Sequence, residues 1–188
     1  MALRFLGLTG GIATGKSTVS RQLADKGAEI LCADSIYHQL IAPSDGCPSP
    51  LAQKISEAFP GVLLEDGSLN RPELGGQVFG NPTQLQQLGS ITHPAVALEV
   101  QRQVEILSQR GVDLVFYDVP LLFERKLENL FGGIIVVWVP QSTQIERLKT
   151  RDGISTEEAQ KRLASQLPID SKKEKATWVI DNSGSPAT

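Results

Sequence analysis

A glycine-rich stretch near the start of the chain, GGIATGKST at positions 10–18, has the residue types and spacing that bind a phosphate chain. It fits the pattern G-x-x-x-x-G-K-[ST], in which glycines allow backbone angles that a Cβ would forbid and N–H groups turn inward around the phosphates. Lys16 is expected to face solvent and to reach the β- and γ-phosphates, and the Ser17 hydroxyl is expected to ligate Mg²⁺. The residues expected to bind the nucleotide are Gly11, Ile12, Ala13, Thr14, Gly15, Lys16, Ser17 and Thr18.

The residues on either side of this stretch predict the elements that must hold it. An apolar run at 3–8 precedes it and predicts a strand, and residues 19–23 have the apolar spacing of a helix. The N-terminus of that helix would add partial positive charge beside the phosphates. This order of strand, loop and helix is the context that identifies a phosphate-binding loop rather than an incidental glycine turn.

Two carboxylates follow further predicted strands. Asp34 comes at the end of a strand predicted at 28–33, and Asp118 ends the apolar strand predicted at 112–117. Because ligands bind beyond the carboxyl ends of parallel strands, Asp34 either faces the phosphate site or caps the helix that follows it. An apolar strand that ends in Asp is the general form of a strand whose carboxylate holds Mg²⁺, so Asp118 is a second candidate metal ligand beside Ser17.

The middle of the chain, at about 43–110, predicts an inserted helical subdomain that could hold an acceptor substrate. It opens with a turn-rich break at 43–50 and looks mainly helical from 51 to 110. The sequences NRPE at 70–73 and NP at 81–82 predict helix starts, because Asn caps a helix and Pro fits its first turn. His93 lies in this block, where a structural role and a catalytic role are both open.

The last part of the chain predicts a strand at 134–139, helices at 141–151 and from 155 onward, and a final strand at 176–180. Residues 147–175 carry eight Lys or Arg and five acids, a local net charge of +3, whereas the rest of the chain carries −6. A basic helical lid of this kind suits a polyanionic ligand, and Arg147 and Arg151 lie four residues apart on one helix face. The alternative is a solvated face with ordinary Lys–Glu pairs.

Five strands that alternate with helices predict an α/β fold with a doubly wound, five-stranded parallel sheet in three layers. With the loop after the first strand, this is the P-loop NTPase architecture in a single domain of 188 residues. Its core is expected at 1–42, 111–140 and 176–188, with the helical insertion at about 43–110 and a helical lid at about 141–175. The absence of an Asn-Lys-x-Asp motif for guanine favours an ATP-dependent kinase over a GTPase.

The composition argues against several classes of protein. A net charge of −3 does not suit a general nucleic-acid binder, and no apolar run approaches the roughly 20 residues that span a bilayer. We expect no signal peptide, because the chain enters a strand at once. The two cysteines, Cys32 and Cys47, do not suggest a disulfide framework. A cytoplasmic location is therefore expected, with no nucleic acid, membrane or obligate protein partner.

Nine pieces of the chain together form a pattern that no single motif shows. They are LTGGIATGKST at 8–18, AD at 33–34, LNR at 69–71, HP at 93–94, PLLFE at 120–124, Arg147, RDG at 151–153, Gln166 and IDN at 180–182. In this order, and over nearly the whole chain, they resemble the motifs of the dephospho-CoA kinase family. Cys32 departs from the family pattern, in which the first Asp of Asp-Ala-Asp is usual, and Ala13 replaces a usual glycine, a change that would stiffen the loop.

The resemblance implies a reaction and a set of roles. The reaction would transfer the γ-phosphoryl group of ATP, with Mg²⁺, to the ribose 3′-hydroxyl of dephospho-CoA, the last step of coenzyme A synthesis. Asp34 would orient or deprotonate that hydroxyl and Lys16 would neutralise the phosphates. Arg147 and Arg151 resemble lid arginines that close over ATP, with Arg151 a candidate catalytic residue, and the Asn182 segment would hold adenine. The acceptor-side candidates, besides Asp34, are Arg71, His93, Leu121 and Leu122.

Two rival interpretations stay open at this point. One is a kinase of the same fold for another small acceptor, such as a nucleoside monophosphate or shikimate, but it gives no reason for the HP and PLLFE pieces. The other is a nucleotide-binding switch that signals to a protein partner, which would hydrolyse its nucleotide slowly and need no small-molecule acceptor.

Overall fold

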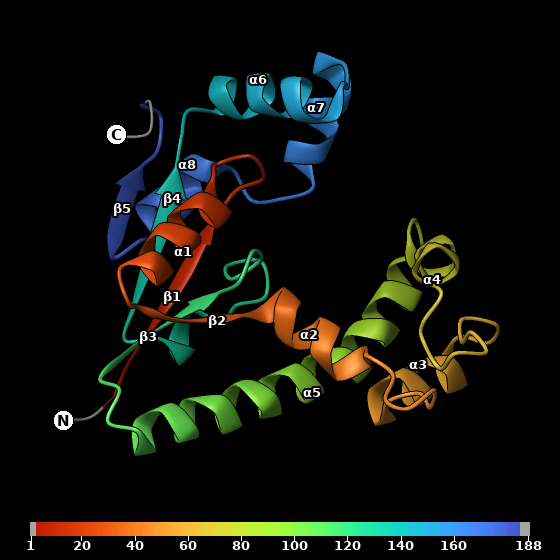
Figure 1. Ribbon diagram of the computed structural model, residues 1–188. Helices are drawn as coiled ribbons and strands as arrows, with labels where there is room; N and C mark the ends of the chain where they lie inside the picture. Colours follow the sequence, from red (N-terminus) through yellow and green to blue (C-terminus); the bar gives the residue numbers. More distant parts are fainter. Residues whose placement is uncertain (1–2, 185–188) are drawn as a thin grey trace. The chain divides into compact units, whose positions relative to one another are not determined.

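The computed structural model describes residues 3–184, and its strands alternate with helices along the chain (Figure 1). The strands are β1 (Arg4–Gly10), β2 (Glu29–Cys32), β3 (Leu114–Asp118), β4 (Gly133–Trp138) and β5 (Trp178–Asp181). The helices are α1 (Lys16–Asp25), α2 (Ala33–Ile41), α3 (Pro50–Ala58), α4 (Arg71–Val78), α5 (Pro82–Gln109), α6 (Gln141–Asp152), α7 (Thr156–Ala164) and α8 (Ile169–Glu174), with one 3₁₀ turn, η1 (Glu128–Leu130).

The five strands form one parallel sheet in the order β2-β3-β1-β4-β5. This confirms the predicted α/β fold and its five-stranded sheet. The register aligns Asp118 of β3 with Leu8 of β1 on one side and with Cys32 of β2 on the other. Because all the strands run the same way, the loops that follow β1, β3 and β4 leave the sheet at one edge, where ligands bind in this class of fold.

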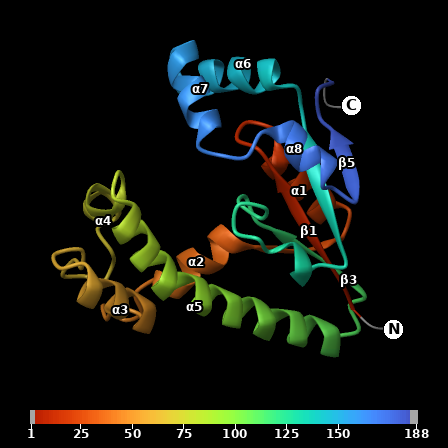
Figure 2. The same cartoon turned by 180° about the vertical axis from the view of Figure 1, so that it is seen from behind.

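Helices cover both faces of the sheet and make it the middle of three layers. Figures 1 and 2, which view the molecule from opposite sides, show α1 on one face and α8 on the other. The covered strands are apolar on both faces: in β4 the side chains of Val136 and Val137 are both fully buried. Leu8, Val19 and Val137 form a core cluster between α1 and the sheet. The edge strand β5 is more open, with Trp178 51% exposed.

The chain divides into two compact units. The sheet unit contains the residues up to Cys32 and from Arg110 onward, and the helical unit is Ala33–Gln109. The helical unit begins before position 43, the expected start of the insertion, because it includes α2. Ile41 of α2 belongs to the same buried cluster as Leu51 and Ile55 of α3.

Several helix starts of the helical unit follow the predicted caps. The Asn70 side chain accepts a hydrogen bond from the N–H of Glu73, and the Asn81 side chain accepts one from the N–H of Gln84. In the sheet unit, Ser155 and Glu158 form the predicted capping box of α7. Across the described residues 3–184, no helix combines the length and the apolar character that crossing a membrane requires.

Candidate active site

The loop between β1 and α1 has the backbone that a phosphate-binding loop requires. Gly15, which caps α1, has φ 85°, and the asparagine Nδ2 of Asn182 lies where a Cβ at Gly15 would stand. Glycine is therefore the residue that fits this position. Ala13 also lies in the left-handed region, with φ 60°. A left-handed backbone is unfavourable for alanine, which explains why a glycine is usual at this position in the family it resembles.

The N-terminus of α1 is open to an anion. No side chain caps it, and its first turn contains no acidic residue. The first N–H groups of a helix lack partners within the helix, so an uncapped start offers them to a negatively charged ligand. Ser17 and Thr18 in this first turn are exposed, which leaves the Ser17 hydroxyl accessible.

Lys16 forms an ion pair with Asp118 at the end of β3. The Lys16 side chain is only 15% exposed, so the expectation that it faces solvent is wrong. The reason lies in the register: β3 is the neighbour of β1 and ends in a buried carboxylate, which attracts the ammonium of the residue that follows the loop. The pairing brings Asp118 to the loop, and its role as a metal ligand stays a prediction.

Ser17 and Asp118 have the donor chemistry of a Mg²⁺ site. Mg²⁺ prefers oxygen ligands and usually keeps several waters, with one or two protein ligands and the substrate phosphates completing its shell. Within residues 3–184, no group of three or more His, Cys, Asp or Glu side chains is placed to hold a metal. A hydroxyl and a carboxylate beside a phosphate loop are oxygen donors of the kind that Mg²⁺ takes together with substrate phosphates.

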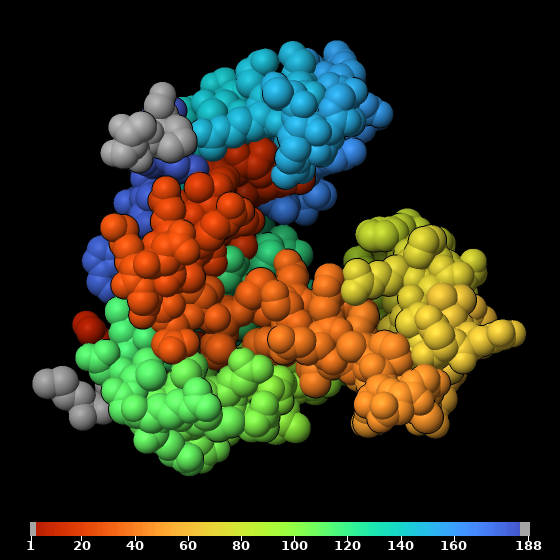
Figure 3. Space-filling view, in the orientation of Figure 1, coloured from red at the N-terminus to blue at the C-terminus, as the bar shows by residue number. Residues whose placement is uncertain are grey.

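Two predicted nucleotide-site residues, Arg147 and Asn182, hold the loop itself. The Arg147 guanidinium donates to the carbonyl oxygens of Thr14 (3.3 Å) and Asn182 (2.8 Å). The Asn182 side chain donates to the same Thr14 oxygen at 2.8 Å. The structure thus brings α6 and the end of β5 to the phosphate loop. The space-filling view shows the dark red atoms that follow β1 directly beneath the cyan and blue atoms of α6 and α7 (Figure 3).

Two glutamines bind the next part of the loop, at Ile12. The Gln144 side chain of α6 donates to the carbonyl oxygen of Ile12 at 2.6 Å, and the Gln166 side chain accepts from the Ile12 N–H at 3.0 Å. Gln144 is 2% exposed. Sequence reasoning missed Gln144, although its place three residues before Arg147 puts both side chains on one face of α6.

A buried lysine, Lys172 of α8, reaches the first residue of the loop. Its side chain is 0% exposed, and its ammonium donates to the carbonyl oxygen of Gly10 (3.1 Å) and to the carboxylate of Glu124 (2.8 Å). The same Glu124 oxygen accepts from the N–H of Leu167 at 3.0 Å. Burial raises the pKa of the Glu124 carboxyl, but these hydrogen bonds outweigh burial and hold the pKa below its usual value. No pattern among the residues around Lys172 distinguishes it from the neighbouring lysines.

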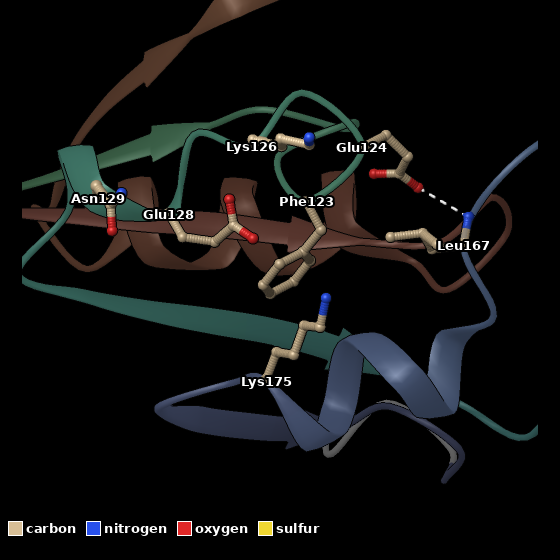
Figure 4. A pocket seen from close by; sticks show the side chains of 7 residues that line it. All are labelled: Phe123, Glu124, Lys126, Glu128, Asn129, Leu167 and Lys175. Atoms are coloured by element: carbon tan, nitrogen blue, oxygen red, sulfur yellow. Dashed lines mark hydrogen bonds between the residues drawn. The ribbon is translucent and has the colours of Figure 1, made fainter.

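A pocket of about 720 Å³ lies beside Glu124 (Figure 4). Figure 4 shows the Glu124 carboxylate turned toward the backbone N–H of Leu167, while the ammonium of Lys175 faces the ring of Phe123, 5.9 Å from its centre. None of the predicted site residues lines this pocket. The residues that do are Phe123, Glu124, Lys126, Glu128, Asn129, Leu167 and Lys175.

Arg151 is not brought to the loop. It pairs with its neighbour Asp152, which also accepts from Arg162 at 2.6 Å, and its side chain is 60% exposed. Arg147 and Arg151 therefore occupy one helix but have different partners. Part of the positive charge of residues 147–175 is thus paired locally, as the solvated-face alternative required.

The acceptor-side candidates have different surroundings. In the helical unit, Asp34 is exposed in the first turn of α2, and His93 is exposed on α5. Arg71 begins α4, and its charge lowers the pKa of Tyr37, although burial of the phenol raises that pKa more. In the sheet unit, Leu121 is half-buried.

Leu122 is fully buried, and its side chain occupies the space where a Cβ at Gly7 of β1 would stand. Leu122 is therefore a core residue, and its expected contact with the acceptor is not supported.

Comparisons with known proteins point to one family. The dephospho-CoA kinase family model matches residues 4–187. The dephospho-CoA kinase of Carboxydothermus hydrogenoformans is 44% identical over 186 residues, which are 98% of this chain and 88% of that protein. That of Symbiobacterium thermophilum is 45% identical over 184 residues, or 97% of this chain and 75% of that protein.

Two solved structures are similar to this chain over nearly its whole length. The TT1252 protein of Thermus thermophilus superposes with a TM-score of 0.82 at 32% identity, covering 98% of this chain and 91% of its own. The dephospho-CoA kinase of Campylobacter jejuni gives a TM-score of 0.65 at 29% identity, covering 97% and 89%. With this fold, this loop and these relatives, the chain belongs to the dephospho-CoA kinase family.

Proposed function

We propose that this kinase transfers the γ-phosphoryl group of ATP to the ribose 3′-hydroxyl of dephospho-CoA, which gives coenzyme A and ADP. The observation that carries the proposal is the phosphate loop, with its left-handed Gly15, its uncapped helix start and its Lys16, in a chain of this family. Phosphoryl transfer needs little covalent chemistry from the protein, so positioning and charge neutralisation are the main tasks of these residues.

The nucleotide would lie on the loop at 11–18. The N–H groups of the loop and of the first turn of α1 would bind the phosphate oxygens, and Lys16 would shift from Asp118 toward the β- and γ-phosphates. Ser17 and Asp118 would hold Mg²⁺, which neutralises charge that develops on the phosphates. Arg147 and Asn182 would support the loop from behind, at the Thr14 carbonyl oxygen.

For the acceptor, we propose candidates in each unit separately: Asp34, Arg71 and His93 in the helical unit, and Leu121 in the sheet unit. We propose Asp34 as the group that orients the attacking hydroxyl or takes its proton, since it is an exposed carboxylate two residues after the end of β2. Arg71 and His93 are proposed to bind the anionic parts of dephospho-CoA, because both side chains are exposed and can donate hydrogen bonds.

The test is release of ADP by the wild-type protein with dephospho-CoA, AMP, shikimate or no acceptor, together with the mass of the product. We expect release that depends on dephospho-CoA and a product heavier by one phosphoryl group. Release with AMP or shikimate alone would mean a kinase for another acceptor, and slow release that no acceptor changes would mean a nucleotide switch.

The same assay tests Asp34. We expect Asp34→Asn to lower kcat by roughly 10²- to 10⁴-fold, the range of an acid–base group, with little change in affinity for ATP. The matched control is Asp25→Asn, an exposed carboxylate at the end of α1, which should keep kcat within about twofold of the wild type. Loss of ATP binding with an intact kcat at saturation would assign Asp34 to the nucleotide or metal instead.

A further inference from the structure

We propose that Gln144 and Lys172 are positioning residues of the nucleotide site. They hold the carbonyl oxygens of Ile12 and Gly10, and so set the direction of the N–H groups of Ala13 and Gly11 in the phosphate loop. This inference rests on the proposed function in one respect, which is that the loop binds the phosphates of a nucleotide.

The argument starts from the geometry of the peptide bond. A peptide unit is planar and trans, so the carbonyl oxygen of one residue and the N–H of the next point in opposite directions. A donor that holds the Ile12 oxygen therefore turns the Ala13 N–H away from that donor, toward the opposite side of the loop. The same relation joins the Gly10 oxygen to the Gly11 N–H. Every second carbonyl from Gly10 to Thr14 is held in this way by side chains from residues 144–182.

The two side chains are built into the protein behind the loop. Gln144 is 2% exposed and donates at 2.6 Å, and Lys172 is 0% exposed and donates at 3.1 Å. Glu124 balances the lysine charge, and is itself held by the backbone of Leu167 (Figure 4). A lysine is almost never fully buried unless it is paired, and apolar side chains of similar volume are often at least as stable as a buried ion pair. The hydrogen bond from Lys172 to the Gly10 carbonyl oxygen is our explanation for a buried lysine at this position.

The conformation of Ala13 gives an independent reason why the loop needs this support. Ala13 has φ 60°, an angle that costs an alanine free energy and that the residue would leave if it were not restrained. The peptide that Gln144 holds is the one that joins Ile12 to Ala13. Gln144 is therefore placed to keep this strained residue in the conformation that binds phosphate.

The lead experiment compares Gln144→Met with Gln141→Met, an exposed glutamine at the start of the same helix. The affinity for ADP is measured by calorimetry, at a temperature where circular dichroism shows both variants folded. We expect Gln144→Met to weaken ADP binding by roughly tenfold, as loss of one hydrogen bond that orients a charged ligand allows, and Gln141→Met to change it less than twofold. Gln144→Glu keeps the shape but has no N–H to donate, so it should weaken ADP binding at least as much.

The second experiment compares Lys172→Met with Lys173→Met, its neighbour, whose ammonium lies 3.8 Å from the centre of the Trp138 ring. Only Lys172→Met should raise the KM for ATP, by roughly tenfold, with the KM for dephospho-CoA unchanged. Lys172→Met leaves the Glu124 carboxylate without its partner, which should lower the melting temperature. Glu124→Gln/Lys172→Met removes that unpaired charge, so its melting temperature should be higher than that of Lys172→Met, while its affinity for ADP should stay weakened.

Three results would overturn the proposal. ADP affinity equal to that of the wild type in folded Gln144→Met and Gln144→Glu would overturn it for Gln144. ADP affinity that recovers with melting temperature in Glu124→Gln/Lys172→Met would show that Lys172 only stabilises the fold. A raised KM for dephospho-CoA without a change for ATP would place these residues at the acceptor. Failure of the proposed function would appear separately, as wild-type protein that binds ADP but does not phosphorylate dephospho-CoA.

Discussion

Lys16 and Asp118 show how the charge of the loop is balanced within the sheet unit. The ion pair joins a lysine at the start of α1 to a carboxylate that is only 6% exposed, so each group depends on the other. Removing the ammonium takes away the partner of a buried charge and, in the proposed mechanism, the cation beside the phosphates. A change at Lys16 should therefore affect turnover and stability together.

We expect Lys16→Met to lower kcat by at least about 100-fold, because the cation no longer stabilises the transferring phosphoryl group. Its melting temperature should fall as well, since Asp118 is left buried and unpaired. Lys16→Met/Asp118→Asn should regain melting temperature but not turnover. Turnover and circular dichroism on the same samples test this, with the exposed Lys26→Met as control, and turnover near that of the wild type in Lys16→Met would refute the role given to the loop.

Ala13 offers a stability test in which a change to glycine is expected to raise the free energy of unfolding. Its left-handed φ of 60° costs an alanine about 1–2 kcal/mol, a cost that glycine does not have. We therefore expect Ala13→Gly to raise the free energy of unfolding by up to about 1 kcal/mol, after the greater freedom of glycine in the unfolded chain is subtracted. Ala24→Gly, at an exposed position of α1, should lower it by about 1 kcal/mol. Urea unfolding of both variants measures this, and a loss of stability in Ala13→Gly would contradict the strain.

At the scale of elements, α6 carries two arginines four residues apart, and this spacing predicted that both would meet the nucleotide from one face of the helix. The structure separates them: Arg147 is bound to Thr14 of the loop and to the carbonyl oxygen of Asn182 after β5, whereas Arg151 is 60% exposed and paired with Asp152. We expect Arg147→Ala to weaken ADP binding by roughly tenfold, measured in the absence of an acceptor substrate. Arg151→Ala should leave ADP affinity within about threefold of the wild type but slow phosphoryl transfer.

Hydrogen exchange tests whether residues 151–164, at the end of α6 and in α7, close on the nucleotide. Amides around Arg147 should be protected with and without an ATP analogue, because that turn of α6 is tied to the loop in both states. Amides at 151–164 should gain protection only with the analogue, as a lid would. Equal protection of 151–164 in both conditions would make these residues a solvated helix face.

Much of the fold could be predicted from local signals, because strands, caps and the loop leave marks in consecutive residues. The buried strands, the Asn70 and Asn81 caps and the left-handed loop all follow from residues close together in the chain. The support behind the loop could not be predicted, because Gln144 and Lys172 act on residues more than a hundred positions away. Nothing in the run of lysines near Lys172 says which one is buried, and nothing in PLLFE says that Leu122 faces β1.

At the scale of the whole molecule, several carboxyls have lowered pKa values and so make stability depend on pH. Hydrogen bonds from Arg102 and Gln103 lower the pKa of Glu99 to about 2, and hydrogen bonds from Lys172 and Leu167 lower that of Glu124 despite its burial. A carboxyl whose pKa is lower in the folded state contributes stability above its unfolded pKa and loses it as pH falls through the folded value. Acid should therefore destabilise the fold progressively below about pH 4.5, near the pKa of unfolded glutamate.

Glu124 allows this dependence to be traced to one buried pair. We expect Glu124→Gln to lower the free energy of unfolding at pH 7 by about 1–3 kcal/mol, less than a fully buried pair because the carboxylate is 19% exposed. The difference from the wild type should shrink as pH falls and the wild-type carboxyl becomes protonated, since a protonated glutamate and a glutamine are both neutral. Urea unfolding at several pH values between 7 and 3 measures this, with Glu57→Gln, an exposed carboxyl of α3, as control. A difference that stays constant over that range would mean that Glu124 stabilises the fold through its shape and not through its charge opposite Lys172.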